Sequence, residues 1–74
     1  MLSKLRFSQI VGENLKKARL KKGLTQDELA HKGGFYRTYI NLVETAKRTP
    51  SSYSLFRIAS SLGIKVGELY PSTV

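Results

Sequence analysis

The chain lacks cysteine, holds one histidine and two prolines, and has only five acidic residues among 74. Without cysteine, neither a disulfide framework nor thiolate metal ligation is possible. There are no paired carboxylates, no cluster of metal ligands and no nucleophile–base set, so we expect neither an enzyme nor a cofactor. No apolar stretch approaches the roughly 20 residues of a membrane span, and the N-terminus lacks the apolar core of a signal peptide. These absences predict a soluble, cytoplasmic protein with no membrane contact and no evident small-molecule ligand.

Basic residues are abundant by contrast, since thirteen lysines and arginines give the chain a net charge of +8 and a pI near 10.1. The charge is uneven: residues 1–37 hold nine basic and three acidic side chains, and residues 38–74 hold four and two. Five of the seven residues from Lys16 to Lys22 are basic. A field of this size favours a polyanionic partner such as nucleic acid. The charge alone also fits a solvated helix surface, and it does not identify the polyanion.

Apolar residues recur at helical spacing along the chain and predict an all-α fold of five short helices around one core, in a single domain of residues 1–74. We expect the helices at about residues 8–22, from Thr25 to just before Gly33, at 37–44, from Ser51 or Ser52 to Gly63, and at 66–70. Thr25 and Glu28 have the spacing of a capping box, which marks the start of the second helix. Pro71 prevents the last helix from extending.

The second and third of these helices, within about residues 25–44, are joined by a turn that contains Gly33 and Gly34. Polar residues that can form hydrogen bonds open the third helix. This is the layout of a helix-turn-helix, whose second helix lies in the major groove of DNA. The pattern predicts that Arg37, Thr38 and Asn41 contact the bases.

The chain resembles the helix-turn-helix family of phage repressors and Cro proteins over about residues 12–70. The matching residues lie at fixed offsets: Leu24-Thr25-Gln26, Leu29-Ala30, Gly34, Ile40, Glu44, Pro50-Ser51, Leu55, Ile58-Ala59, Leu62-Gly63 and Glu68-Leu69. Within that family, Arg37-Thr38-Tyr39-Ile40 is most similar to the small controller proteins of restriction–modification systems. The resemblance implies a compact, repressor-like DNA-binding domain that recognises double-stranded DNA and acts as a sequence-specific transcriptional regulator.

The predicted base contacts lie at the start of the third helix. The guanidinium of Arg37 can pair with O6 and N7 of guanine, and the amide of Asn41 with N6 and N7 of adenine. Thr38 can contact a phosphate or a thymine methyl group. Tyr36 stands where the family usually has Ser, Thr or Asp as N-cap, so either the helix begins differently or the ring contacts a sugar or thymine methyl group. An ordinary surface position is the alternative for Arg37, Thr38 and Asn41, and contact with phosphate alone is a further alternative for Arg37.

The resemblance implies phosphate contacts for Gln26 at the start of the second helix, and for Lys47 and Arg48 in the loop after the third. The alternatives are an ordinary surface glutamine and two solvated loop cations. Tyr39 is a further candidate for contact with the DNA backbone, with packing on the second helix as its alternative. Ala46 stands where the family usually has glycine, which implies either a right-handed turn or local strain.

Two further expectations concern the scaffold and its assembly. Arg19 and Glu44 stand where the family pairs an arginine of the first helix with a glutamate of the third, which implies a structural ion pair. Because a single recognition helix reads few base pairs, we also expect a homodimer on a near-palindromic operator. The candidate interface residues, unless they complete the monomer core, are Val66, Leu69, Tyr70, Ile64 and Phe56.

Two other functions fit parts of this pattern. An antitoxin or other protein-interaction module would bind a protein partner and repress its own promoter secondarily, although no spare segment for such a partner is evident. Non-specific nucleic-acid binding would account for the charge, but it would leave the hydrogen-bonding residues of the third helix without a role.

Overall fold

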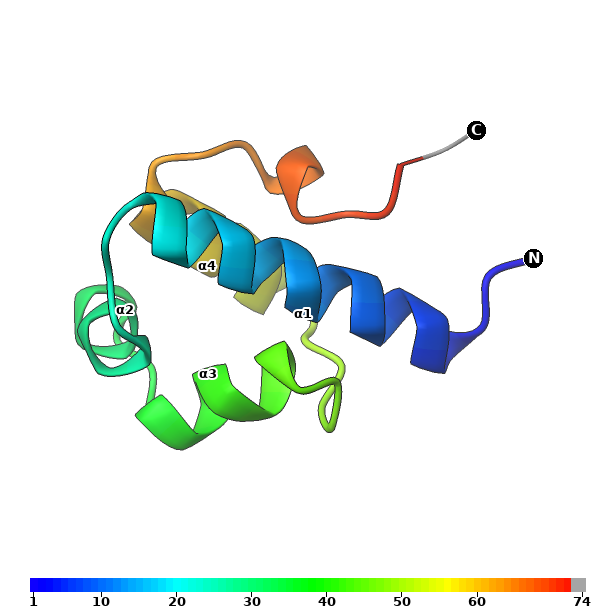
Figure 1. The fold of residues 1–74 in the computed structure, drawn as a ribbon, viewed down its shortest axis with the longest axis horizontal. Helices are drawn as coiled ribbons and strands as arrows, with labels where there is room; N and C mark the ends of the chain where they lie inside the picture. The colour runs from blue at the N-terminus through cyan, green and yellow to red at the C-terminus, as the bar shows by residue number, and fades with distance from the viewer. Residues whose placement is uncertain (73–74) are drawn as a thin grey trace.

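The computed structural model describes residues 1–72, which form four α-helices and one turn of 3₁₀-helix (Figure 1). In chain order these are α1 (Lys4–Lys21), α2 (Gln26–Gly33), α3 (Arg37–Glu44), α4 (Ser52–Leu62) and η1 (Val66–Glu68). The predicted all-helical fold is confirmed, since the described residues contain no strand. The predicted fifth α-helix at 66–70 is wrong, because a single 3₁₀ turn forms there. Gly67 disfavours an α-helix by about 1 kcal/mol relative to alanine, and so short a segment cannot offset the cost of helix nucleation.

The first helix, α1, begins at Lys4, earlier than the predicted start at Ser8. Its N-cap is Ser3, whose hydroxyl accepts a hydrogen bond of 3.0 Å from the N–H of Arg6. Ser8 is buried inside the helix, where its hydroxyl lies 2.6 Å from that of Thr49 in the loop after α3. The sequence did not reveal the additional turn, because Lys4, Leu5 and Arg6 are exposed and only Phe7 in that turn packs against the core.

The helix-turn-helix consists of α2, the turn that follows it, and α3. The predicted capping box of α2 is confirmed: Thr25 Oγ1 accepts from the N–H of Glu28 at 3.0 Å, and Glu28 Oε1 accepts from the N–H of Thr25 at 2.8 Å. These hydrogen bonds with Thr25 hold the pKa of Glu28 below its ordinary value. At the other end Gly34, with a left-handed φ of 73°, ends α2 and begins the turn.

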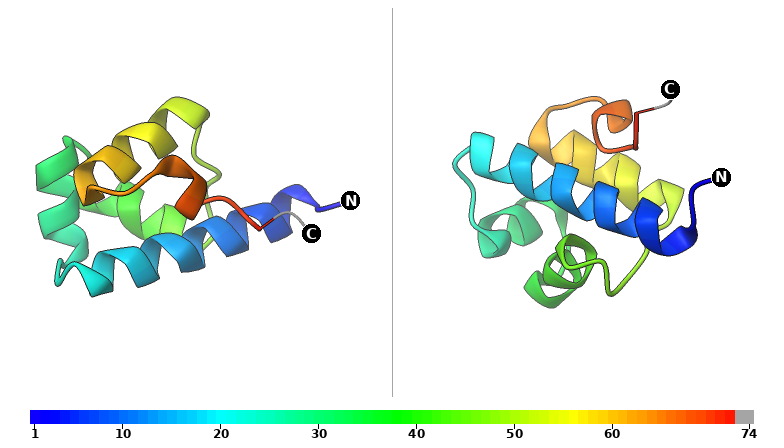
Figure 2. Two further views of the ribbon diagram at one scale, coloured as in Figure 1. Left: turned by 90° about the horizontal axis from the view of Figure 1, so that it is seen from above. Right: turned by 45° about the vertical axis from the view of Figure 1, so that its right-hand side comes forward.

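One hydrophobic core joins the helices and the C-terminal turn. Its fully buried members are Val11, Leu15, Leu29, Ala30, Ile40, Val43, Leu55, Ile58, Ala59, Leu62 and Leu69. On α1, α3 and α4 these residues recur three or four positions apart, and the two on α2, Leu29 and Ala30, are adjacent, so each helix buries a single face. α3 lies along one side of α1, and η1 lies on the opposite side (Figures 1 and 2). The polar face of α3 is therefore left at the surface, away from the C-terminal turn.

Gly12 allows α1 to pass closely against the C-terminal end of α3. A Cβ atom added at this position would lie 2.6 Å from the carbonyl oxygen of Val43 and 2.7 Å from that of Glu44. Both atoms belong to the backbone, so they cannot turn aside as the end of a side chain can. Gly12 therefore sets the distance between α1 and the helix that is predicted to read DNA.

Candidate nucleic-acid interface

The exposed face of α3 begins immediately after the turn. Arg37, Thr38 and Asn41 are exposed, whereas the apolar residues of the same helix are buried in the core. Helical geometry places Arg37 and Asn41, four residues apart, on the same side of α3. Together with Gln26 from the start of α2, these three residues line one depression in the surface. The structure thus brings together, from two helices, four of the residues predicted to contact DNA.

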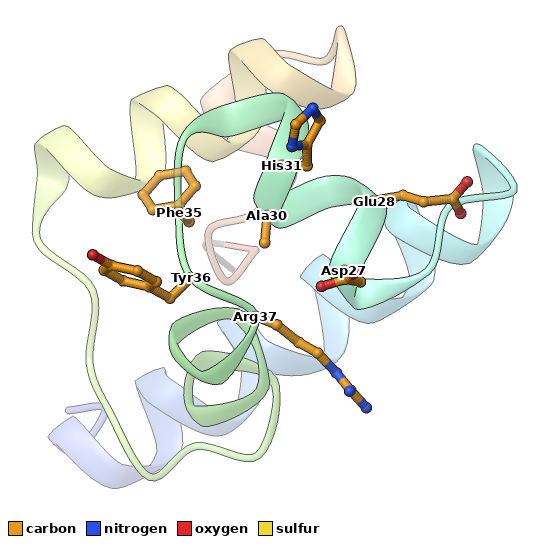
Figure 3. Close-up of a pocket in the computed structure, with 7 residues that line it drawn as sticks. All are labelled: Asp27, Glu28, Ala30, His31, Phe35, Tyr36 and Arg37. Carbon is orange, nitrogen blue, oxygen red and sulfur yellow. The ribbon is translucent and has the colours of Figure 1, made fainter.

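Tyr36 lies apart from that depression. It is the N-cap residue of α3 but makes no capping hydrogen bond through its side chain, and it is 84% exposed. In Figure 3, Phe35 and Tyr36 point to one side of the turn, and Arg37 points to the other. Because α3 begins at Arg37 as predicted, the missing polar cap does not change where the helix starts. A contact of the Tyr36 ring with DNA stays a prediction.

Arg19 and Glu44 form a buried ion pair between α1 and the end of α3. Arg19 Nε lies 2.6 Å from Glu44 Oε2, and Arg19 Nη2 donates to Glu44 Oε1 at 3.0 Å. The two side chains are only 8% and 2% exposed. Arg19 Nη1 also donates to the carbonyl oxygen of Leu24 at 2.7 Å. The hydrogen bond to Glu44 raises the pKa of Arg19, a side chain that is charged at physiological pH in any case.

Gln26 connects this ion pair to the exposed face of α3. Its Nε2 donates to Glu44 Oε1 at 3.1 Å, and its Oε1 accepts from Asn41 Nδ2 at 3.4 Å. An amide nitrogen carries two hydrogens, so one N–H of Gln26 remains for a phosphate. The side chain predicted to position the protein on DNA is therefore itself positioned by the ion pair.

A stack of aromatic and arginine side chains supports the turn between α2 and α3. The rings of Phe35 and Tyr39 stack with centroids 5.5 Å apart and planes at 11°. The guanidinium carbon of Arg57, from α4, lies 4.3 Å from the centroid of Phe35, and that of Arg48 lies 5.5 Å from the centroid of Tyr39. Arg57 Nη2 also donates to the carbonyl oxygen of Gly33 at 2.7 Å. Tyr39 is thus half-buried by packing, and its contact with the DNA backbone stays a prediction.

Arg57 was not among the residues predicted to shape the site. Tyr53, one turn earlier on α4, has its ring centroid 5.8 Å from the guanidinium carbon, but the contacts that reach the turn are with the carbonyl oxygen of Gly33 and the ring of Phe35, both more than 20 residues earlier in the chain. No local sequence pattern marks such a contact. A cation beside the last carbonyl groups of α2 is stabilising, because the C-terminus of a helix carries a partial negative charge. Arg57 therefore holds the turn from which α3 starts.

The loop after α3 carries the two exposed cations Lys47 and Arg48. The backbone N–H groups of these two residues donate to the carbonyl oxygen of Leu42 at 2.9 and 3.2 Å, and these hydrogen bonds define the path of the loop. Ala46, just before them, has a φ of 61° and is the one residue other than glycine with a positive φ among residues 1–72. Of the two alternatives for this position, the structure has the strained one, because a left-handed conformation crowds the Cβ atom.

Replacing Ala46 by glycine is expected to stabilise the protein by about 0.5–1 kcal/mol. Relief of the left-handed strain contributes roughly 1–2 kcal/mol, and the greater freedom of glycine in the unfolded chain offsets about 0.4–1 kcal/mol of it. Thermal unfolding should show a rise in Tm of about 2–8 °C. Ala46→Val is the matched opposite change, because a β-branched side chain worsens the same crowding. An unchanged or lower Tm for Ala46→Gly would contradict this account of the loop.

The candidate dimer residues differ widely in exposure. Phe56 on α4 is 58% exposed, and Tyr70 is 37% exposed. Ile64 and Val66 are half-buried and pack against the core. Leu69 is completely buried within the monomer, so it completes the core and offers no surface to a partner. Of the five candidate interface residues, only the first four present any surface to a second copy.

Residues 1–72 contain no group of three His, Asp or Glu side chains placed to hold a metal ion. Within the same residues, none of the helices has both the length and the apolar character needed to cross a membrane.

A known protein family and several known proteins are similar to this chain. The model of the HTH_3 helix-turn-helix family matches residues 15–69, a range that contains α2, the turn and α3. The chain belongs to this helix-turn-helix family. The predicted resemblance to repressors and restriction–modification controllers is thereby confirmed, since relatives of both kinds are found.

Individual relatives match almost the whole chain. The chain is 35% identical over 65 residues to the uncharacterized HTH-type transcriptional regulator y4dJ of Sinorhizobium fredii, which covers 88% of this chain and 84% of the relative. It is 38% identical over 68 residues to the control protein C.MunI of a Mycoplasma species, covering 90% and 86%. The crystal structure of the restriction-modification controller protein C.AhdI from Aeromonas hydrophila superposes with a TM-score of 0.83 at 33% identity, covering 85% of this chain and 96% of that one.

Proposed function

We propose that the protein is a sequence-specific transcriptional regulator that binds double-stranded DNA by placing α3 in the major groove. The observation that carries this proposal is the exposed group of Arg37, Thr38 and Asn41 on a helix that a buried ion pair anchors. Reading bases requires hydrogen-bonding side chains on an element whose position is fixed. Tyr36 adds an exposed ring that points to the opposite side of the turn from Arg37. The proposed phosphate contacts are Gln26, Tyr39, Lys47 and Arg48.

We further propose that two copies bind a near-palindromic operator together. The exposed side chains of Phe56 and Tyr70, with the exposed edges of Ile64 and Val66, support a contact between copies. The two recognition helices of such a dimer would enter successive major grooves about 34–36 Å apart. The similarity to the controller C.AhdI, of which the chain covers 96%, supports a role in controlling a restriction–modification system.

Selection of bound sequences from a random pool of duplex DNA tests the proposed function. We expect one enriched site with two symmetric half-sites. On that site Arg37→Ala should remove about 1–3 kcal/mol of discrimination at one guanine, because it removes a bidentate contact. The control Lys47→Ala should weaken binding to all DNA about equally, because a phosphate contact carries no sequence information.

Two results would contradict these assignments. If Arg37→Ala loses the same affinity on the selected site and on random DNA, Arg37 does not read a base. If no sequence is enriched from the pool, the protein is not a sequence-specific regulator.

A further inference from the structure

A chain of hydrogen bonds leads from a buried carboxylate to the exposed face of α3. The Glu44 side chain, 2% exposed, accepts hydrogen bonds from Arg19 at 2.6 and 3.0 Å and from Gln26 Nε2 at 3.1 Å. The other end of the Gln26 amide, Oε1, accepts from Asn41 Nδ2 at 3.4 Å. Asn41 is exposed and lines the same depression as Arg37 and Thr38. A residue proposed to read a base is therefore connected to the interior through Gln26.

The chemistry of the groups fixes the direction of this chain. An ionised carboxylate accepts hydrogen bonds and has none to donate, so Gln26 must turn its NH₂ group toward Glu44. The Gln26 oxygen then faces Asn41, and Asn41 can satisfy it only by donating from Nδ2. Arg19 cannot reverse the direction of these hydrogen bonds, because a guanidinium donates hydrogen bonds and has no acceptor. The side-chain amides of Gln26 and Asn41 therefore each have one favoured orientation of the two that the shape of an amide permits.

The orientation of Asn41 decides what it presents to DNA. With one N–H given to Gln26, the side chain keeps its second N–H and its Oδ1 for a base. A donor next to an acceptor matches the N7 acceptor and the N6 amino group of adenine in the major groove. If the Asn41 amide could flip, it would also present its NH₂ group to the O6 of guanine or the O4 of thymine, both of which are acceptors.

We propose that Glu44, acting through Gln26, holds the Asn41 amide in one orientation and thereby restricts Asn41 to adenine. The proposal rests on the proposed function, since it assumes that α3 reads DNA. Glu44 and Gln26 act here as positioning residues, because neither needs to touch the base. Gln26 keeps its second N–H for a phosphate, so the same side chain both places the protein on DNA and sets the preference of its neighbour.

The test measures affinity for the selected site and for its three variants at each base pair of one half-site. Asn41→Ala first identifies the base pair that Asn41 reads, as the position where the preference is lost. For the wild type we expect adenine to be favoured there about 5-fold or more. In Gln26→Met, which keeps the length of the side chain but not its hydrogen bonds, most of that preference should disappear. Lys47→Ala is the control, and it should lower the affinity for all four bases alike.

The outcomes separate the alternatives. If Gln26→Met weakens binding to every variant equally and keeps the adenine preference, Gln26 is a phosphate contact alone and the proposal is overturned. It is also overturned if the base at that position is not adenine, or if Asn41→Ala changes the preference nowhere. In those cases the proposed function stands, whereas a wild type that does not distinguish the selected site from random DNA removes both. Gln26→Ala is the second variant if Gln26→Met does not reach the wild-type Tm.

Discussion

Replacing Gly12 by alanine should destabilise the protein by about 1–3 kcal/mol, although alanine favours a helix over glycine by about 1 kcal/mol. The added methyl group would meet the carbonyl oxygens of Val43 and Glu44 at 2.6 and 2.7 Å. Because these are backbone atoms of α3, α1 and α3 must move apart to accommodate the methyl group. In a domain of this size a loss of 1 kcal/mol lowers Tm by about 4–8 °C.

The matched control for this change is Gly67→Ala. A Cβ atom at Gly67 meets nothing within 4 Å, and the residue has no positive φ. Thermal unfolding followed by circular dichroism should therefore show little change for Gly67→Ala and a fall of at least about 4 °C for Gly12→Ala. Equal Tm values for Gly12→Ala and the wild type would mean that α1 and α3 do not pack as closely as described.

Removal of the Glu44 carboxylate should be more damaging still, with a cost of about 3–5 kcal/mol. Glu44→Ala leaves the buried guanidinium of Arg19 without an opposite charge and removes the acceptor of Gln26. Domains are stabilised by about 5–15 kcal/mol, with small ones toward the lower end. The variant should therefore approach the limit of stability, and urea unfolding should show a midpoint far below that of the wild type.

Two further variants test whether the loss of stability in Glu44→Ala comes from the broken ion pair. Glu13→Ala removes an exposed acid from α1 and should cost less than about 0.5 kcal/mol, as most surface substitutions do. Arg19→Met combined with Glu44→Leu removes both charges together and should recover most of the stability that Glu44→Ala loses. A Glu44→Ala protein as stable as Glu13→Ala would show that the pair does not anchor α3.

Local signals in the sequence predicted the helix-turn-helix well. The observed α3 spans Arg37–Glu44, as predicted, and Thr25 and Glu28 form the expected capping box. Both features depend on residues within a few positions of one another, so the sequence order already contains them. The fifth helix was predicted wrongly because the apolar spacing of residues 66–70 fits one turn of either an α- or a 3₁₀-helix.

Contacts between distant parts of the chain were harder to predict. Nothing near Gly12 in the sequence shows that a backbone from α3 lies against it, and nothing near Arg57 shows that a carbonyl of Gly33 needs a donor. The roles of Gln26 and Asn41 toward DNA depend on a partner as well as on the fold, so they stay predictions. Their mutual hydrogen bond and its link to Glu44 required the structure.

The ion pair that anchors α3 is largely out of reach of dissolved ions. Its side chains are 8% and 2% exposed, so added salt screens it far less than it screens charges at the surface. The cations proposed to hold phosphates, Lys47 and Arg48, are exposed, and their contacts with DNA would release bound counterions. We therefore expect a rise in ionic strength to lower the affinity for DNA without displacing α3 from its position in the fold.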